Sequence, residues 1–171
     1  MNQLFDLLIF LVPIYIANAI PVVLGGGMPL DFGLVLPDCE RLFGKGKTIR
    51  GFIAGVLGGT AAGGLVAMIY VLPFFAGPQQ QFIASFVLAL GTMTGDAVGS
   101  FVKRRAHVDS GRPFVLDTLF FLVMALIFVY PVANGSLYEP FDLAFMLILT
   151  VILHPLTNAI ANRAGLKKVP W

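Results

Sequence analysis

Five apolar stretches, each about 20 residues long, constrain this chain more than any other feature of its sequence. They cover Leu4–Leu24, Ile49–Phe75, Phe82–Val102, Phe114–Ala133 and Phe141–Ala161. A helix of that length crosses the ~30 Å hydrocarbon layer of a bilayer, and in lipid a helix satisfies all of its own backbone hydrogen bonds. Charged residues make up 12% of the chain, against about 25% in soluble domains. The sequence therefore predicts an all-α integral membrane protein with about five transmembrane helices, forming one domain over residues 1–171.

Basic residues are gathered in three of the segments that join or follow these stretches. The three segments carry Lys45, Lys47, Arg50, Lys103, Arg104, Arg105, Arg112, Lys167 and Lys168. The links near Gly77 and Glu139 carry no lysine or arginine, so basic and non-basic segments alternate along the chain. Cytoplasmic loops of membrane proteins are enriched in lysine and arginine. We therefore expect the N-terminus outside the cell, and the C-terminus and the basic segments in the cytoplasm.

An acidic residue, Asp96, interrupts the third apolar stretch shortly before it ends in three cations. Helical spacing places Asp96 on the same face as Lys103 and Arg104, about two turns away. A carboxylate at this depth is costly unless it meets a cation, a metal ion or water. One interpretation is a structural ion pair with a neighbouring lysine or arginine. The other is a metal ligand at the floor of a phosphate site, and it predicts catalytic roles for Asp96, Lys103 and Arg104.

Three further polar residues, Asn18, Asp117 and Asn158, lie near the predicted cytoplasmic ends of apolar stretches. Topology and attraction to anionic lipid explain the basic segments, but neither requires polar groups inside the membrane. A polar cleft open to the cytoplasm does, and a basic cleft suits a polyanion such as a nucleoside triphosphate. We expect Asn18 and Asn158 to contact this ligand. Asp117 either stabilises the start of its helix or joins Asp96 as a catalytic ligand of Mg²⁺.

The segment formed by residues 44–48, Gly-Lys-Gly-Lys-Thr, partly matches a P-loop. The match fails because an arginine stands where that motif needs its first glycine, and because no strand precedes it. The backbone N–H groups and the two lysines can still surround phosphate oxygens. We expect Lys45 and Lys47 to bind phosphate, with Arg50 as a bidentate contact. Thr48 either caps the following helix or contacts phosphate.

Two ladders of glycine at every fourth position indicate close helix packing. One runs from Gly51 to Gly63 in the second apolar stretch, and the other from Gly91 to Gly99 in the third. Small residues at this spacing let helix backbones approach closely. We expect the second and third helices to pack on one another and so to hold Asp96 in a fixed position.

Several ordered motifs along the whole chain resemble the archaeal CDP-archaeol synthases, small relatives of the CDP-diacylglycerol synthases. The motifs are Ala17–Pro21, Arg41–Gly51, Gly95–Arg105, Thr157–Asn158 and Gly165–Trp171. The wider family also shows a Lys-Arg pair, a later aspartate and an acidic cluster that opens the next helix. That order is matched by Lys103-Arg104, Asp109 and Asp117. Two features differ: the Pro-Gly-His-Gly-Gly run of the wider family is absent, and Phe120 stands where a second acid of the cluster is expected.

The resemblance implies a Mg²⁺-dependent cytidylyltransferase that transfers CMP from CTP to an unsaturated di-geranylgeranyl ether glycerol phosphate. Its implied partners are CTP, the isoprenoid lipid and the bilayer, and no nucleic acid. The single cysteine, Cys39, permits neither an intrachain disulfide nor a CxxC pair. Two alternatives stay open: a membrane transporter or binding protein for a phosphorylated anion, and a purely structural helix bundle.

Overall fold

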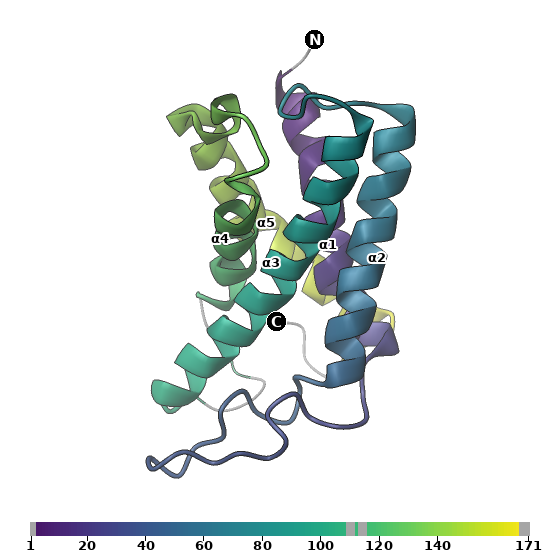
Figure 1. The fold of residues 1–171 in the computed structure, drawn as a ribbon. Helices are drawn as coiled ribbons and strands as arrows, with labels where there is room; N and C mark the ends of the chain where they lie inside the picture. The colour runs from purple at the N-terminus through teal and green to yellow at the C-terminus, as the bar shows by residue number, and fades with distance from the viewer. Residues whose placement is uncertain (1–2, 109–111, 113–115, 168–171) are drawn as a thin grey trace.

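The computed structural model describes residues 3–108, 112 and 116–167 and places five α-helices in them (Figure 1). In chain order these are α1 (Gln3–Leu24), α2 (Ile49–Ile69), α3 (Pro78–Arg105), α4 (Asp117–Val129) and α5 (Pro140–Arg163), with a 3-10 helix, η1 (Gly135–Tyr138), before α5. Successive helices run in opposite directions, so the loop between α1 and α2 and the C-terminal end of α3 lie at one end of the bundle. The N-terminus lies at the other end. The described residues form no strand, and the all-α prediction is confirmed.

Four of these helices, α1, α2, α3 and α5, are long and apolar enough to cross a membrane. The apolar part of α4, Thr118–Val129, is shorter, and the predicted start of this span at Phe114 lies outside the described residues. α3 has 28 residues, which makes it about 42 Å long, against a hydrocarbon layer of ~30 Å. α3 is therefore longer than that layer is thick, and its last turn carries Lys103, Arg104 and Arg105.

Several helix boundaries differ from the sequence prediction, including both that flank the link between α2 and α3. The sequence predicts a second span that reaches Phe75, but α2 ends at Ile69 because Tyr70 takes an extended backbone with φ −146° and ψ 116°. α3 starts at Pro78, before the predicted Phe82. Proline favours this early start because its fixed φ and its missing N–H suit the first position of a helix.

The glycine ladder of α2 packs on both α1 and α3. A Cβ atom added at Gly59 would lie 2.7 Å from Ala17 Cβ and 2.8 Å from Ala89 Cβ, closer than carbon atoms normally approach. The ladder of α3 faces α4 instead, and a Cβ atom added at Gly91 would lie 2.8 Å from Ala125 Cα. The expectation that the second and third helices pack on one another is therefore confirmed. α3 meets the α2 ladder with Ala89, and its own ladder faces α4 because Gly91 lies about 200° around the helix from Ala89.

The apolar core fills the space between α1, α3 and α4. Its largest fully buried side chains include Phe10 and Ile14 of α1, Leu88 of α3, and Phe121 and Leu122 of α4. α5 packs beside this core, but only 11% of its most apolar window is buried. In a membrane, the remaining apolar surface of α5 faces lipid.

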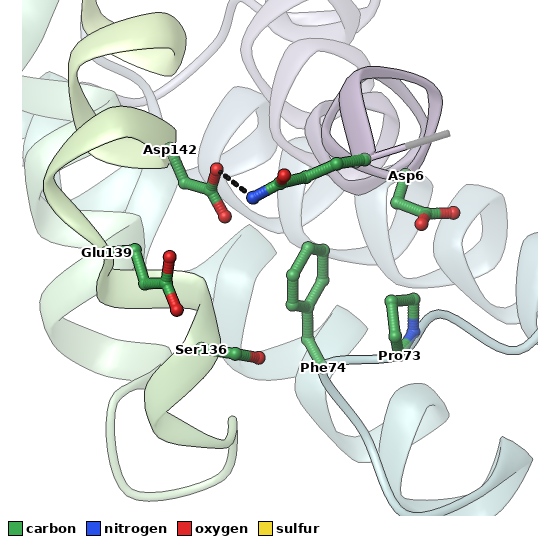
Figure 2. Close-up of a pocket in the computed structure, with 7 residues that line it drawn as sticks. Asp6, Pro73, Phe74, Ser136, Glu139 and Asp142 are labelled. Atoms are coloured by element: carbon green, nitrogen blue, oxygen red, sulfur yellow. Dashed lines mark hydrogen bonds between the residues drawn. The ribbon is translucent and has the colours of Figure 1, made fainter. Parts of the chain in front are cut away.

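A cavity of about 330 Å³ opens at the end of the bundle where α1 begins (Figure 2). Three acidic residues, Asp6, Glu139 and Asp142, are among those that line it. Gln3 Nε2 donates a hydrogen bond to Asp142 Oδ1, and the Tyr70 hydroxyl donates one to Asp6 Oδ1, both at 2.7 Å. This cavity is acidic and lies at the opposite end from the basic loop (Figures 1 and 2). It is therefore not the predicted phosphate site.

Candidate active site

The basic loop between α1 and α2 is tied to the start of α2. Thr48 is the N-cap of α2, and its hydroxyl accepts hydrogen bonds from the backbone N–H groups of Gly51 and Gly26, both at 3.1 Å. The Leu30 N–H donates to the carbonyl of Lys47 at 2.7 Å, which joins the two ends of the loop. The capping alternative for Thr48 is thus confirmed. Lys47 is held directly before α2, at the basic end of the bundle.

The centre of the loop is Asp31, whose side chain is fully buried. Its oxygens accept hydrogen bonds from the Arg41 guanidinium and from the backbone N–H groups of Gly33, Phe43 and Gly44, the last three at 3.0–3.1 Å. Burial alone would raise the pKa of Asp31, but these hydrogen bonds outweigh it and lower the pKa to about 2. Asp31 is therefore ionised at neutral pH.

The loop meets α3 through an ion pair between two of the predicted site residues. Lys47 Nζ lies 2.6 Å from Asp96 Oδ2, and the two side chains are 27% and 25% exposed. α3 holds Asp96 in place because the preceding Gly95 packs directly on the α4 backbone, where an added Cβ would lie 2.7 Å from Phe121 Cα. A phosphate-binding candidate and a metal-binding candidate thus share one partly exposed site.

The C-terminal turn of α3 brings two more predicted residues to the same end. Lys103 is 8% exposed, and its Nζ donates to the carbonyl of Arg112 at 2.5 Å. Arg104 lies against the loop, where a Cβ added at Gly44 would be 3.8 Å from Arg104 Nε. Among the described residues this buried Nε has no hydrogen-bond partner. Arg104 thus lies beside the lysine-rich loop with a donor that the described residues leave unused, and its contact with phosphate stays a prediction.

Two features of the loop escaped sequence reasoning. Arg105 pairs with Asp38 at 3.0 Å and donates to the Arg41 carbonyl at 2.9 Å, so it fastens the loop to the end of α3. These partners are more than 60 positions apart in the chain and leave no local signal. The hydrogen bonding of the buried Asp31 side chain did leave a local signal in the sequence. Aspartate followed two residues later by Gly33 is typical of a turn in which the carboxylate accepts a backbone N–H.

The remaining predicted phosphate contacts are distributed over the loop and three helices. Lys45 is exposed in the loop, Arg50 is exposed in the first turn of α2, and Asn18 is half-buried on α1. Asn158 Oδ1 of α5 accepts a hydrogen bond from Lys167 Nζ at 3.0 Å, so the segment after α5 folds back on that helix. Phosphate binding by these four residues stays a prediction.

Asp117 is the first residue of α4, as predicted, but its side chain lies outside the described part, as do Asp109 and Lys168. Its role as a second metal ligand therefore stays a prediction. Within the described residues, no three His, Cys, Asp or Glu side chains are grouped to hold a metal ion. The partly exposed Asp96 carboxylate still fits Mg²⁺, which takes one or two carboxylates and completes its shell with substrate phosphates and water.

The sequence and the structure of this chain are similar to those of one family of known proteins. A family model described as CarS-like, CDP-archaeol synthase, matches residues 1–171. A CDP-archaeol synthase of Pyrococcus horikoshii is 43% identical over 173 residues, which cover 100% of this chain and 99% of that protein. One of Methanopyrus kandleri is 47% identical over 163 residues, 95% of this chain and 90% of that protein. A solved structure of an intramembrane enzyme for archaeal membrane lipids biosynthesis matches 92% of this chain and 96% of its own, with a TM-score of 0.80 and 38% identity.

Proposed function

This chain belongs to the CDP-archaeol synthase family, and we propose that it transfers CMP from CTP to an unsaturated di-geranylgeranyl ether glycerol phosphate in the membrane. The contact that carries the proposal joins Lys47 to Asp96 at 2.6 Å. It places a cation of the loop and an acid of a membrane helix in one partly exposed site. Such a site can take the charged groups of both substrates while the isoprenoid chains stay in the bilayer.

The basic residues of the site are suited to a triphosphate. Lys45, Lys47 and Arg50 flank the start of α2, and Arg104 presents a buried nitrogen without an acceptor from the described residues. Charge-assisted hydrogen bonds from lysine and arginine are the strong ones in phosphate recognition. We assign the triphosphate of CTP to the loop cations and Arg104, and we propose that Lys103, which donates to the Arg112 carbonyl, contacts one of the two substrate phosphates.

The reaction needs no general base. The lipid phosphate has a second pKa near 6 and is largely dianionic at neutral pH. One of its oxygens attacks the α-phosphorus of CTP, the bond between that phosphorus and the bridging oxygen breaks, and pyrophosphate leaves with the bond electrons. The chain therefore has two tasks: it holds two polyanions in line and it offsets their charge.

Mg²⁺ fits this site, with Asp96 as its protein ligand and Asp117 as the proposed second one. When bound, the ion supplies charge neutralisation at the triphosphate and polarises the α-phosphate. Asp96 is paired with Lys47 in the structure, and its carboxylate would be the ligand that holds the ion. We propose that the site faces the cytoplasm and that the N-terminus lies outside, because the described basic segments gather at one end of the bundle.

Purified protein incubated with radiolabelled CTP, Mg²⁺ and the prenyl-ether glycerol phosphate tests the proposal. We expect labelled CDP-lipid and one pyrophosphate for each product formed. A matched reaction with the dephosphorylated lipid should give none, since it lacks the nucleophile. Absence of labelled lipid across a range of lipid and metal concentrations would refute the proposed activity.

A further inference from the structure

Asp31 connects two parts of the basic loop that are separated in the sequence. Its carboxylate accepts the backbone N–H groups of Phe43 and Gly44 at 3.1 Å and is paired with Arg41. The adjacent Leu30 N–H donates to the carbonyl of Lys47 at 2.7 Å. The lysine segment is therefore held on both sides, at residues 43–44 and at residue 47, by residues 30–31.

Between these two attachments the segment has one further backbone hydrogen bond, from the Lys47 N–H to the Gly44 carbonyl at 3.4 Å, besides the ion pair of Lys47 with Asp96. Gly44 adopts a φ of +91°, and an added Cβ at Gly46 would meet no atom within 4 Å. Lys45 and Gly46 are exposed. Glycines here give the backbone wide conformational freedom, so the course of the segment depends on its two ends. Of the two, the Phe43–Gly44 end is fixed by the Asp31 carboxylate.

The structure assigns Asp31 as a positioning residue of the nucleotide site, one that acts through Lys45 and Lys47 without touching substrate. This inference rests on the proposed function for its ligand, CTP. Fixing the loop before the ligand arrives removes an ordering cost from binding. A chain without the Asp31 carboxylate should therefore bind CTP more weakly, while its chemical step, which depends on Asp96, should change less.

The test variant is Asp31→Asn, which keeps the size of the side chain. Its amide nitrogen replaces one acceptor oxygen, and because each oxygen accepts from both Arg41 and the backbone, one Arg41 nitrogen and one or two backbone N–H groups lose their acceptor in either orientation. We expect the KM for CTP to rise about tenfold, the range given by loss of one charge-assisted hydrogen bond, with kcat changed by less than about threefold. Glu40→Gln is the matched control, because its partly exposed carboxylate in the same loop lies 4.0 Å from His107 Nδ1, and its KM should stay within about twofold of wild type.

Hydrogen exchange separates this inference from the proposed activity. In detergent and without ligand, amides in residues 43–48 should exchange at least tenfold faster in Asp31→Asn than in wild type, while α2 exchanges at an unchanged rate. Unchanged exchange in residues 43–48, or a fall in kcat with an unchanged KM, overturns the positioning role. If wild-type protein forms no CDP-lipid, the proposed function fails, and the exchange measurement still decides whether Asp31 orders the loop.

Discussion

Lys47 Nζ and Asp96 Oδ2 are 2.6 Å apart, so the residue proposed to bind phosphate and the residue proposed to bind Mg²⁺ neutralise each other in the ligand-free chain. The ion pair is about one quarter exposed and is therefore within reach of an incoming ion or phosphate. On the proposed binding of CTP and Mg²⁺, the Lys47 side chain would exchange Asp96 for a phosphate, and the Asp96 side chain would exchange Lys47 for the metal ion. An acid that would be costly alone in the membrane is stabilised until then.

Lys47→Met should change metal binding and nucleotide binding in opposite directions. The variant leaves Asp96 without its cation, so Mn²⁺ used as a probe should bind the nucleotide-free protein about threefold or more tightly, since nearby like charges disfavour each other. CTP should bind about tenfold more weakly, because one charged phosphate contact is lost. Electron paramagnetic resonance of free Mn²⁺ and calorimetry with CTP give the two constants. Weaker binding of both ligands would contradict the exchange of partners.

Asp96→Asn should abolish turnover and leave the fold intact. We expect kcat/KM to fall roughly 100-fold or more, because charge stabilisation by a metal ion contributes several kcal/mol. The ion pair is partly exposed, so the unfolding temperature should move little. Glu139→Gln, an acid at the far cavity, should keep the wild-type rate. Full activity of Asp96→Asn in the CDP-lipid assay would remove this carboxylate from the catalytic machinery.

The architecture could be predicted from local patterns, but the contacts of the site could only partly be predicted. Runs of apolar residues dictate helices, because lipid offers backbone groups no partner. The sequence offered an ion pair as one interpretation of Asp96, and the structure contains such a pair. The sequence did not show which of several nearby cations is the partner, and the structure shows that it is Lys47. The glycine ladder of α3 predicted a close helix contact, and in the structure α4 makes that contact. A ladder shows that another helix comes close, and the choice between α2 and α4 depends on the rotation of α3 in the assembled bundle.

Gly95→Ala tests whether α4 holds Asp96 in position. An added Cβ would lie 2.7 Å from Phe121 Cα, so α3 and α4 must move apart. Such overpacking costs about 1–3 kcal/mol of unfolding free energy, and turnover should fall with it because Asp96 is the next residue. Gly135→Ala is the control, since its Cβ meets no atom within 4 Å, and its effect should stay within about 0.5 kcal/mol. Unfolding in detergent and the CDP-lipid assay measure both variants, and a stable, fully active Gly95→Ala would disprove the tight contact.

Asp31 makes the folded protein sensitive to acid below about pH 4. Its pKa is about 2 in the folded chain against an ordinary value of 3.8. Because the folded value is the lower one, ionised Asp31 stabilises the fold fully above pH 3.8, and this contribution is lost as the pH falls toward 2. The difference between these two pKa values corresponds to about 2 kcal/mol of unfolding free energy. Thermal unfolding should show Asp31→Asn less stable than wild type at pH 6 and nearly equal to it at pH 2. A stability difference that does not change between these two pH values would contradict the assignment.

The orientation of the bundle can be tested with thiols at its two ends. Cys39 is exposed in the basic loop, so a membrane-impermeant maleimide should label it only from the cytoplasmic side. In a Cys39→Ser background, Gly77→Cys should be labelled only from outside, because Gly77 precedes α3 at the opposite end. The substitution is well tolerated by geometry, since a Cβ at Gly77 meets no atom within 4 Å.

Intact cells and inverted membrane vesicles present the two sides of the membrane separately. Labelling of Gly77→Cys in the vesicles and of Cys39 in the cells would reverse the proposed orientation and place the Lys47–Asp96 site outside, where cytoplasmic CTP does not reach it.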